Sequence, residues 1–211
     1  MLWARIEEGR CAEFTDRDPA GRYPDHDRWV QVPEAYARFV DLTWIVDAAG
    51  GPMPGDLAAF RQTLKDAVAE RRYQAQVTGP LHNDLRYHAD NQSVSVMETA
   101  LAAARRYEAA NGAGSFTTTW KARTGFAALT LPDLEAAANA VMLFVQRCFN
   151  REAEIALALD GLQDHAALFA AYSTMIAACW PGDDCEDGTV GATPPTLAPA
   201  APAPDPEPEA A

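Results

Sequence analysis

The stretch FTTTWKARTGFAALTLPDLEAAANAVMLFVQRCFN, residues 116–150, decides the fold. Its first part is rich in threonine and aromatic residues and is divided by a polar ARTG turn, which predicts a β-hairpin with strands at 116–121 and 126–129. The hairpin runs directly into TLPD, where the threonine fits a helix N-cap and the proline fits the first turn. We therefore expect a long amphipathic helix over 131–159, ended by Asp160-Gly161.

Three further helices are predicted around this unit. AAGGPMPGD has the glycine and proline content of a linker, and its last residue, Asp56, is a suitable N-cap for a helix over 57–74. Asp90 or Ser93 can cap a second helix over 94–109, which a short strand at 85–88 precedes. A last helix is expected over 164–179.

The first 46 residues have the pattern of a small β unit. Apolar and polar residues alternate over 3–6, and 11–14 can return as the second strand of a hairpin. WVQVP predicts a third short strand, and FVDLTWIV (39–46) has the β-branched and aromatic content of a fourth.

The chain ends in an acidic segment rich in alanine and proline. From Asp183 it carries seven acids and no base, and it holds too little apolar surface to offset the entropy of ordering, which predicts disorder. The expected fold class is therefore α+β, divided into a small N-terminal β unit (1–48), a linking helix (56–75), a helix-rich module with a short β-hairpin (76–162), a C-terminal helix (163–181) and a disordered acidic tail (182–211).

Composition limits the function classes. The chain has 211 residues, 48% hydrophobic, with 17 Lys and Arg against 30 Asp and Glu, a net charge of −13. Such a charge repels phosphate backbones, which disfavours nucleic-acid binding. No window has the apolar length of a signal peptide or a membrane span, so we expect no membrane association and folding in the cytoplasm. Four scattered cysteines are too few for a disulfide framework.

Candidate catalytic and metal-binding residues are weak. Alternation would place His82, Asp84 and His88 on one strand face, but Arg86 between them disfavours a cation. No motif positions a base beside Ser93, so a hydrolase is unsupported. We expect no catalytic residues, no cofactor and no metal site.

Two sets of residues are assigned instead to packing and to protein contact. Trp120 is expected to plug the core between the hairpin and the long helix. The predicted structural core comprises Trp120, Phe126, Leu134, Val145 and Phe149. The possible protein-contact residues are Arg147, Arg151 and Glu152, near the end of the long helix, where the alternative is an ordinary solvated face.

The segments YHADNQSVSVMETALAAA and FTTTWKARTGFAALTLPDLEAAANAVMLFVQRCFNREAEI together resemble a family. The pattern is similar to a domain of unknown function found in tailed phages and prophages beside tail-fibre and tail-fibre-assembly genes. The matching positions include His88, Asp90, Trp120, Phe126 and Leu134. The WARIEEGRCAEF opening is also similar to phage tail-associated proteins.

The resemblance implies a non-enzymatic, phage or prophage tail-associated protein. The first expectation is a chaperone-like tail-fibre assembly factor that acts in the bacterial cytoplasm on a tail or tail-fibre protein. A homo-oligomer is a further candidate partner. The alternatives are a minor structural component of the virion tail, an envelope-glycan hydrolase, which would need paired acids in a cleft, or a host-interaction module.

Overall fold

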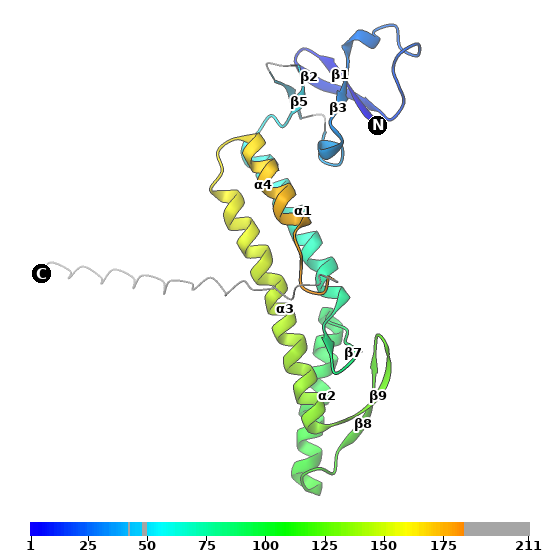
Figure 1. Cartoon of the computed structure of the whole chain (residues 1–211), viewed down its shortest axis with the longest axis vertical. Helices are drawn as coiled ribbons and strands as arrows, with labels where there is room; N and C mark the ends of the chain where they lie inside the picture. The colour runs from blue at the N-terminus through cyan, green and yellow to red at the C-terminus, as the bar shows by residue number, and fades with distance from the viewer. Residues whose placement is uncertain (42, 48–49, 184–211) are drawn as a thin grey trace, which may run out of the picture.

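A small five-stranded sheet stands at one end of a rod of helices (Figure 1). This computed structural model describes residues 1–41, 43–47 and 50–183. The sheet is antiparallel with the order β3-β1-β2-β4-β5. The mixed architecture confirms the predicted α+β class. The strands of the sheet are β1 (Leu2–Glu7), β2 (Arg10–Thr15), β3 (Trp29–Val32), β4 (Ile45–Val46) and β5 (Pro52–Met53).

The first hairpin forms as predicted. β1 and β2 pair across a tight turn in which Glu8 and Gly9 both have positive φ, a conformation that glycine adopts without steric cost. Ala4 points from β1 into the core and is fully buried.

The predicted strand over 39–46 is wrong except at its end. Only Ile45–Val46 is a strand, because Phe39 and Val40 donate backbone hydrogen bonds to the Tyr36 carbonyl in a helical turn. Phe39 packs edge-on against aromatic rings of the helices and not within the sheet. The predicted linker is also partly wrong, since it contains β5. Residues 42, 48 and 49 lie outside the described residues.

Four helices build the rod, and each begins at a side-chain cap. They are α1 (Leu57–Thr78), α2 (Asn91–Asn111), α3 (Leu131–Asp160) and α4 (His165–Ala177). The caps are Asp56, Asp90, Thr130 and Asp164, whose side chains each accept backbone N–H bonds of the first turn, as N-caps do. At 30 residues, α3 is about 45 Å long.

Helix α3 contacts each of the other three helices of the rod. Figure 1 shows α1 and α4 along one half of α3 and α2 along the other. Arg61 of α1 donates to the carbonyls of Leu159 and Leu162 near the C-terminal end of α3. Arg105 of α2 forms an ion pair with Glu135 near the N-terminal end of α3. Two hairpins complete the far half, β6 (Leu81–His82) with β7 (Leu85–Arg86), and β8 (Thr117–Ala122) with β9 (Gly125–Thr130).

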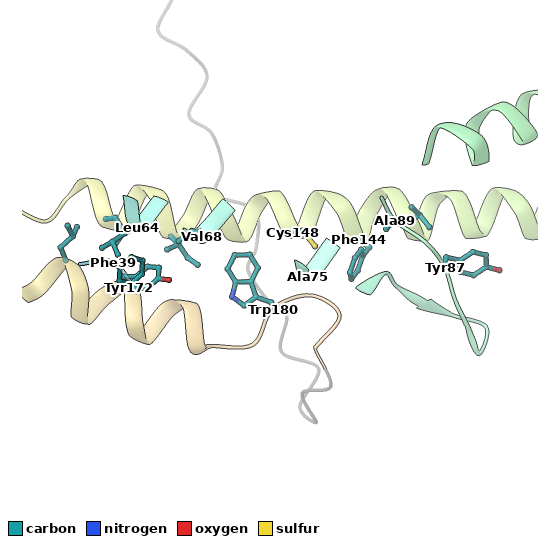
Figure 2. Packing of buried hydrophobic residues seen from close by; sticks show 14 of the residues in the cluster. Phe39, Leu64, Val68, Ala75, Tyr87, Ala89, Phe144, Cys148, Tyr172 and Trp180 are labelled. Carbon is teal, nitrogen blue, oxygen red and sulfur yellow. The ribbon is translucent and has the colours of Figure 1, made fainter. Parts of the chain in front are cut away.

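The core is one continuous row of apolar side chains along α3 (Figure 2). Trp180, just after α4, is fully buried in this row, and its indole N–H donates to the Ile176 carbonyl. Asp183 accepts from the Trp180 backbone N–H and from the Arg71 guanidinium, which also lies over the indole ring. Gly182 and Asp183 therefore belong to the folded part and not to the predicted tail; residues 184–211 lie outside the described residues.

Two of the five predicted core residues are exposed. Leu134 is fully buried, and Trp120 and Val145 pack partly buried against the core. Phe126 is 72% exposed because β9 alternates, with Ala127 and Leu129 facing the helices. Phe149 is 44% exposed because the neighbouring Cys148 is the residue that points into the core. The Arg72 guanidinium carbon lies 4.6 Å from the centre of the Phe149 ring.

The cysteines occupy different environments. Cys11 and Cys148 are buried free thiols, and burial raises the pKa of both, that of Cys148 to about 11. Cys179 is disulfide-bonded, and the prediction from the sequence is limited to the absence of a disulfide framework. Cys185 lies outside the described residues.

Two carboxylates at helix N-termini should make the stability of the fold depend on pH. The Ser93 hydroxyl and backbone N–H lower the pKa of Asp90, and the Thr130 hydroxyl and backbone N–H lower the pKa of Asp133. A lowered folded-state pKa stabilises the fold above the unfolded value of about 3.9, and this contribution is lost as the pH falls through the folded value. We expect thermal melts of an Asp90→Asn/Asp133→Asn variant to lose less stability than the wild type between about pH 5 and pH 3. Parallel pH curves for the two proteins would contradict this assignment.

Candidate protein-binding site

A notch opens between the start of α2 and strand β8. Its volume is about 200 Å³, and it is lined by His88, Gln92, Ser93, Val96, Met97, Trp120 and Lys121. The helix begins here because the Asp90 side chain accepts from the Ser93 backbone N–H at 2.9 Å. Residues three and four apart share one helix face, so Gln92 and Val96 lie along the same wall.

The opposite wall is held in place by backbone contacts of the two hairpins. In the β8–β9 turn, the Arg123 N–H donates to the Arg86 carbonyl at 2.7 Å, and the Arg86 N–H donates to the Thr124 hydroxyl at 3.1 Å. The Arg123 guanidinium also donates to the Val77 carbonyl at the end of α1. These bonds fix the hairpin against α1 and β7, so Trp120 stands in a defined position in the wall.

The notch has an apolar interior and a polar rim. Val96 is 53% exposed, Trp120 is half-buried, and Met97 is buried at the base. The Ser93 hydroxyl donates to the Asp90 carboxylate at 2.7 Å, which is a capping contact. This arrangement suits the binding of an apolar side chain, with His88, Gln92 and Lys121 able to hydrogen-bond the backbone that carries it.

A second, larger cavity lies between the sheet and the start of α1. Its volume is about 440 Å³, and Phe39, Trp44 and Phe60 are among the residues that line it. Asp41 accepts from the backbone and hydroxyl of Thr43, and Asp56 caps α1. Both carboxylates are thus already used in local structure, and we find no converging acid pair among the described residues that line this cavity.

A family model, described as a domain of unknown function, DUF4376, matches residues 59–178. This match covers more than half of the chain. The protein belongs to the DUF4376 family. No curated protein and no solved structure matches the chain.

The DUF4376 match runs from the first turn of α1 to the end of α4. It contains the helical rod except the first two residues of α1, together with both small hairpins and the notch, and it leaves out the N-terminal sheet. It is therefore wider than the module that the sequence placed at 76–162.

In this DUF4376 protein, the three predicted contact residues have different environments. The Arg151 guanidinium donates to Glu154 at 2.8 Å and to the Met175 carbonyl of α4 at 3.1 Å. Glu152 accepts from Arg72 of α1 at 3.0 Å. Arg151 and Glu152 thus tie α3 to its neighbours, and of the three only Arg147 is exposed, with its guanidinium 5.9 Å from the centre of the Phe144 ring.

The histidine and aspartate residues near β6 do not share one strand face. His82 ends β6, Asp84 has a positive φ in the turn, and Arg86 ends β7. Across residues 1–41, 43–47 and 50–183, no three or more His, Cys, Asp or Glu side chains are grouped so that they could hold a metal. In the same part of the chain, no helix combines the length and apolar character of a membrane span.

Sequence reasoning missed Gln92 and Val96 as site residues. Helical spacing places Val94, Met97 and Leu101 on one stripe of α2, and Val96 does not belong to that stripe. An apolar β-branched residue beside the stripe, and not on it, was the available signal. The partner wall could not be found in this way, because it comes from a strand more than twenty residues further along the chain.

Proposed function

We propose that this protein is a non-enzymatic tail-associated protein of a phage or prophage, and that it acts as a chaperone-like tail-fibre assembly factor. The supporting observation is the notch, where Val96 and Trp120 leave apolar surface open to an incoming side chain. The resemblance of the YHAD and hairpin segments to tail-associated phage domains supplies the partner class, a tail or tail-fibre protein. The proposal requires no cofactor, metal or nucleic acid, and it places the protein in the host cytoplasm during assembly.

The physical reason concerns the client before it assembles. Long fibre chains expose strand edges and apolar surface until their own partners cover them, and such surfaces aggregate. An apolar notch on a rigid rod can cover one exposed side chain at a time. The net charge of −13 keeps the complex in solution by repulsion between copies.

Co-expression with the fibre or tail protein encoded beside it tests the proposal. The wild type should raise the soluble yield of that partner, and Val96→Asp should remove most of the increase because a carboxylate at the mouth of the notch opposes apolar contact. Ala102→Asp is the matched control, since it adds the same charge to an exposed position of the same helix outside the notch. Thermal melting of both variants measures whether the fold is intact.

Two results would overturn this proposal. The first is equal partner solubility with and without the protein. The second is an equal loss of the effect with Val96→Asp and Ala102→Asp. Presence of the protein in purified particles, together with no effect on partner solubility, would instead assign it as a minor structural component of the tail.

A further inference from the structure

Helix α3 carries two lines of residues at a spacing of seven, on opposite sides. Val141, Cys148 and Ile155 form the buried line. Leu143, Asn150 and Leu157 form the other line. Because seven residues return within about 20° of the same direction on a helix, each line is nearly straight.

The second line is open to solvent. Leu143 is 66% exposed and Leu157 is 69% exposed, while Asn150 between them is partly exposed. Side chains two positions apart on an α-helix point in directions that differ by about 200°. Leu143 therefore points away from the side on which Val141 packs against the other helices. We call Leu143, Asn150 and Leu157, with the flanking Arg147 and Glu154, the α3 outer face.

The α3 outer face is complementary to itself. Leu143 lies seven residues before Asn150 and Leu157 lies seven after it, so a two-fold axis at Asn150 brings each leucine against the other leucine of a second copy. Arg147 lies three residues before Asn150 and Glu154 four after it, on the same flank. The same axis therefore brings Arg147 of each copy near Glu154 of the other copy, so that two equivalent pairs form. Within one copy the Arg147 guanidinium lies over the Phe144 ring and Glu154 accepts from Arg151, so the pair between copies adds to these contacts or replaces them.

A parallel pairing lacks this charge match. It would bring each residue of the line against the same residue of the second copy. Arg147 would then face Gln146 of the second copy, which is neutral. Both arrangements bring the two Asn150 amides together, where they can hydrogen-bond each other and fix the register of the pair. The charge match is therefore the feature that favours the antiparallel direction. We propose that two copies of this chain associate through the α3 outer face as an antiparallel helix pair centred on Asn150. This surface is distinct from the notch between α2 and β8, and the inference does not rest on the proposed function.

Molar mass measured over a concentration series is the first test. A single helix pair is small for a stable interface, so the series should extend to about 200 µM. The wild type should approach twice its monomer mass of 22.8 kDa, and Leu143→Glu/Leu157→Glu should stay monomeric throughout. Leu81→Glu/Phe126→Glu is the control, because it adds the same charge at leucine and phenylalanine side chains of similar exposure away from this face, and it should dimerise as the wild type does.

Cysteine cross-linking under mild oxidation tests the direction of the helices. Asn150→Cys should form a disulfide-linked dimer with itself, and a mixture of Leu143→Cys with Leu157→Cys should form a mixed dimer. Leu143→Cys alone should not, because the two copies of this residue would lie about 20 Å apart. The wild type under the same oxidation controls for the native cysteines, of which Cys11 and Cys148 are buried.

Three results would overturn the proposal. A wild type that stays monomeric to the highest concentration excludes the dimer. A Leu143→Glu/Leu157→Glu variant that still dimerises excludes this face. Self-cross-linking of Leu143→Cys excludes the antiparallel direction.

Discussion

Replacement of Gly79 by alanine is expected to destabilise the fold strongly and to lower the yield of soluble protein. Gly79 ends α1 with a φ of +76°, and a Cβ atom built on it would lie 1.9 Å from the Tyr87 carbonyl oxygen. That oxygen belongs to the backbone of the segment leading into α2, and the Tyr87 N–H is itself bonded to the Pro80 carbonyl, so neither side can yield by a rotamer change. With a ψ of 157° this positive-φ conformation is essentially restricted to glycine, and alanine in it costs about 1–3 kcal/mol. The overpacking adds about 1–3 kcal/mol or more.

Gly112→Ala is the matched control for this substitution. Gly112 ends α2 with a φ of +96°, and a Cβ atom there would have nothing within 4 Å. It therefore carries the backbone strain without the clash. Soluble yield and thermal melting of the two variants should differ strongly, and equal losses would show that the approach of Gly79 to Tyr87 does not limit the fold.

Trp180→Ala is expected to have the second largest effect. Trp180 is fully buried in the row along α3, and truncation of a buried tryptophan costs about 3–5 kcal/mol. The change also removes the indole hydrogen bond to Ile176 and the surface under the Arg71 guanidinium. At about 2–4 °C per kcal/mol for a chain of this size, the melting temperature should fall by between about 6 and 20 °C.

Phe126→Ala is the control for loss of an aromatic ring. Phe126 is 72% exposed on the solvent side of β9, so its truncation should change the free energy of unfolding by less than about 0.5 kcal/mol. Chemical denaturation of both variants measures the two free energies. A loss for Phe126→Ala as large as that for Trp180→Ala would return Phe126 to the core and contradict the direction of the β9 side chains.

The assembly proposal and the dimer proposal concern separate surfaces. Val96→Asp changes the notch, and the paired leucine substitutions change the α3 outer face, so each variant leaves the other surface intact. A dimer would carry two notches on one particle. Testing the dimer-deficient variant in the co-expression assay would then show whether a client is held at one point or two, since linked sites raise the effective concentration of the second contact.

The sequence by itself determined the local structure. The caps Asp56 and Thr130 begin helices where they were expected, and the Thr-rich hairpin before α3 has the predicted strands within one residue. These features depend on side chains within about four residues of the backbone groups they bond, so their signals are contained in a short stretch of chain.

Only the tertiary structure decided which faces are covered. Alternation along β9 separates Phe126 from Leu129, but it does not say which of the two meets a helix. The aromatic segment that includes Phe39 has strand propensity, yet it turns to pack on the rings of α1 and α4, because contact with distant apolar side chains outweighs local preference. The notch, the buried position of Trp180, the hydrogen bond from Arg151 to the Met175 carbonyl and the ion pair between Arg72 and Glu152 arise in the same way. Each joins residues that are far apart in the chain and that meet only when α3 brings their elements together.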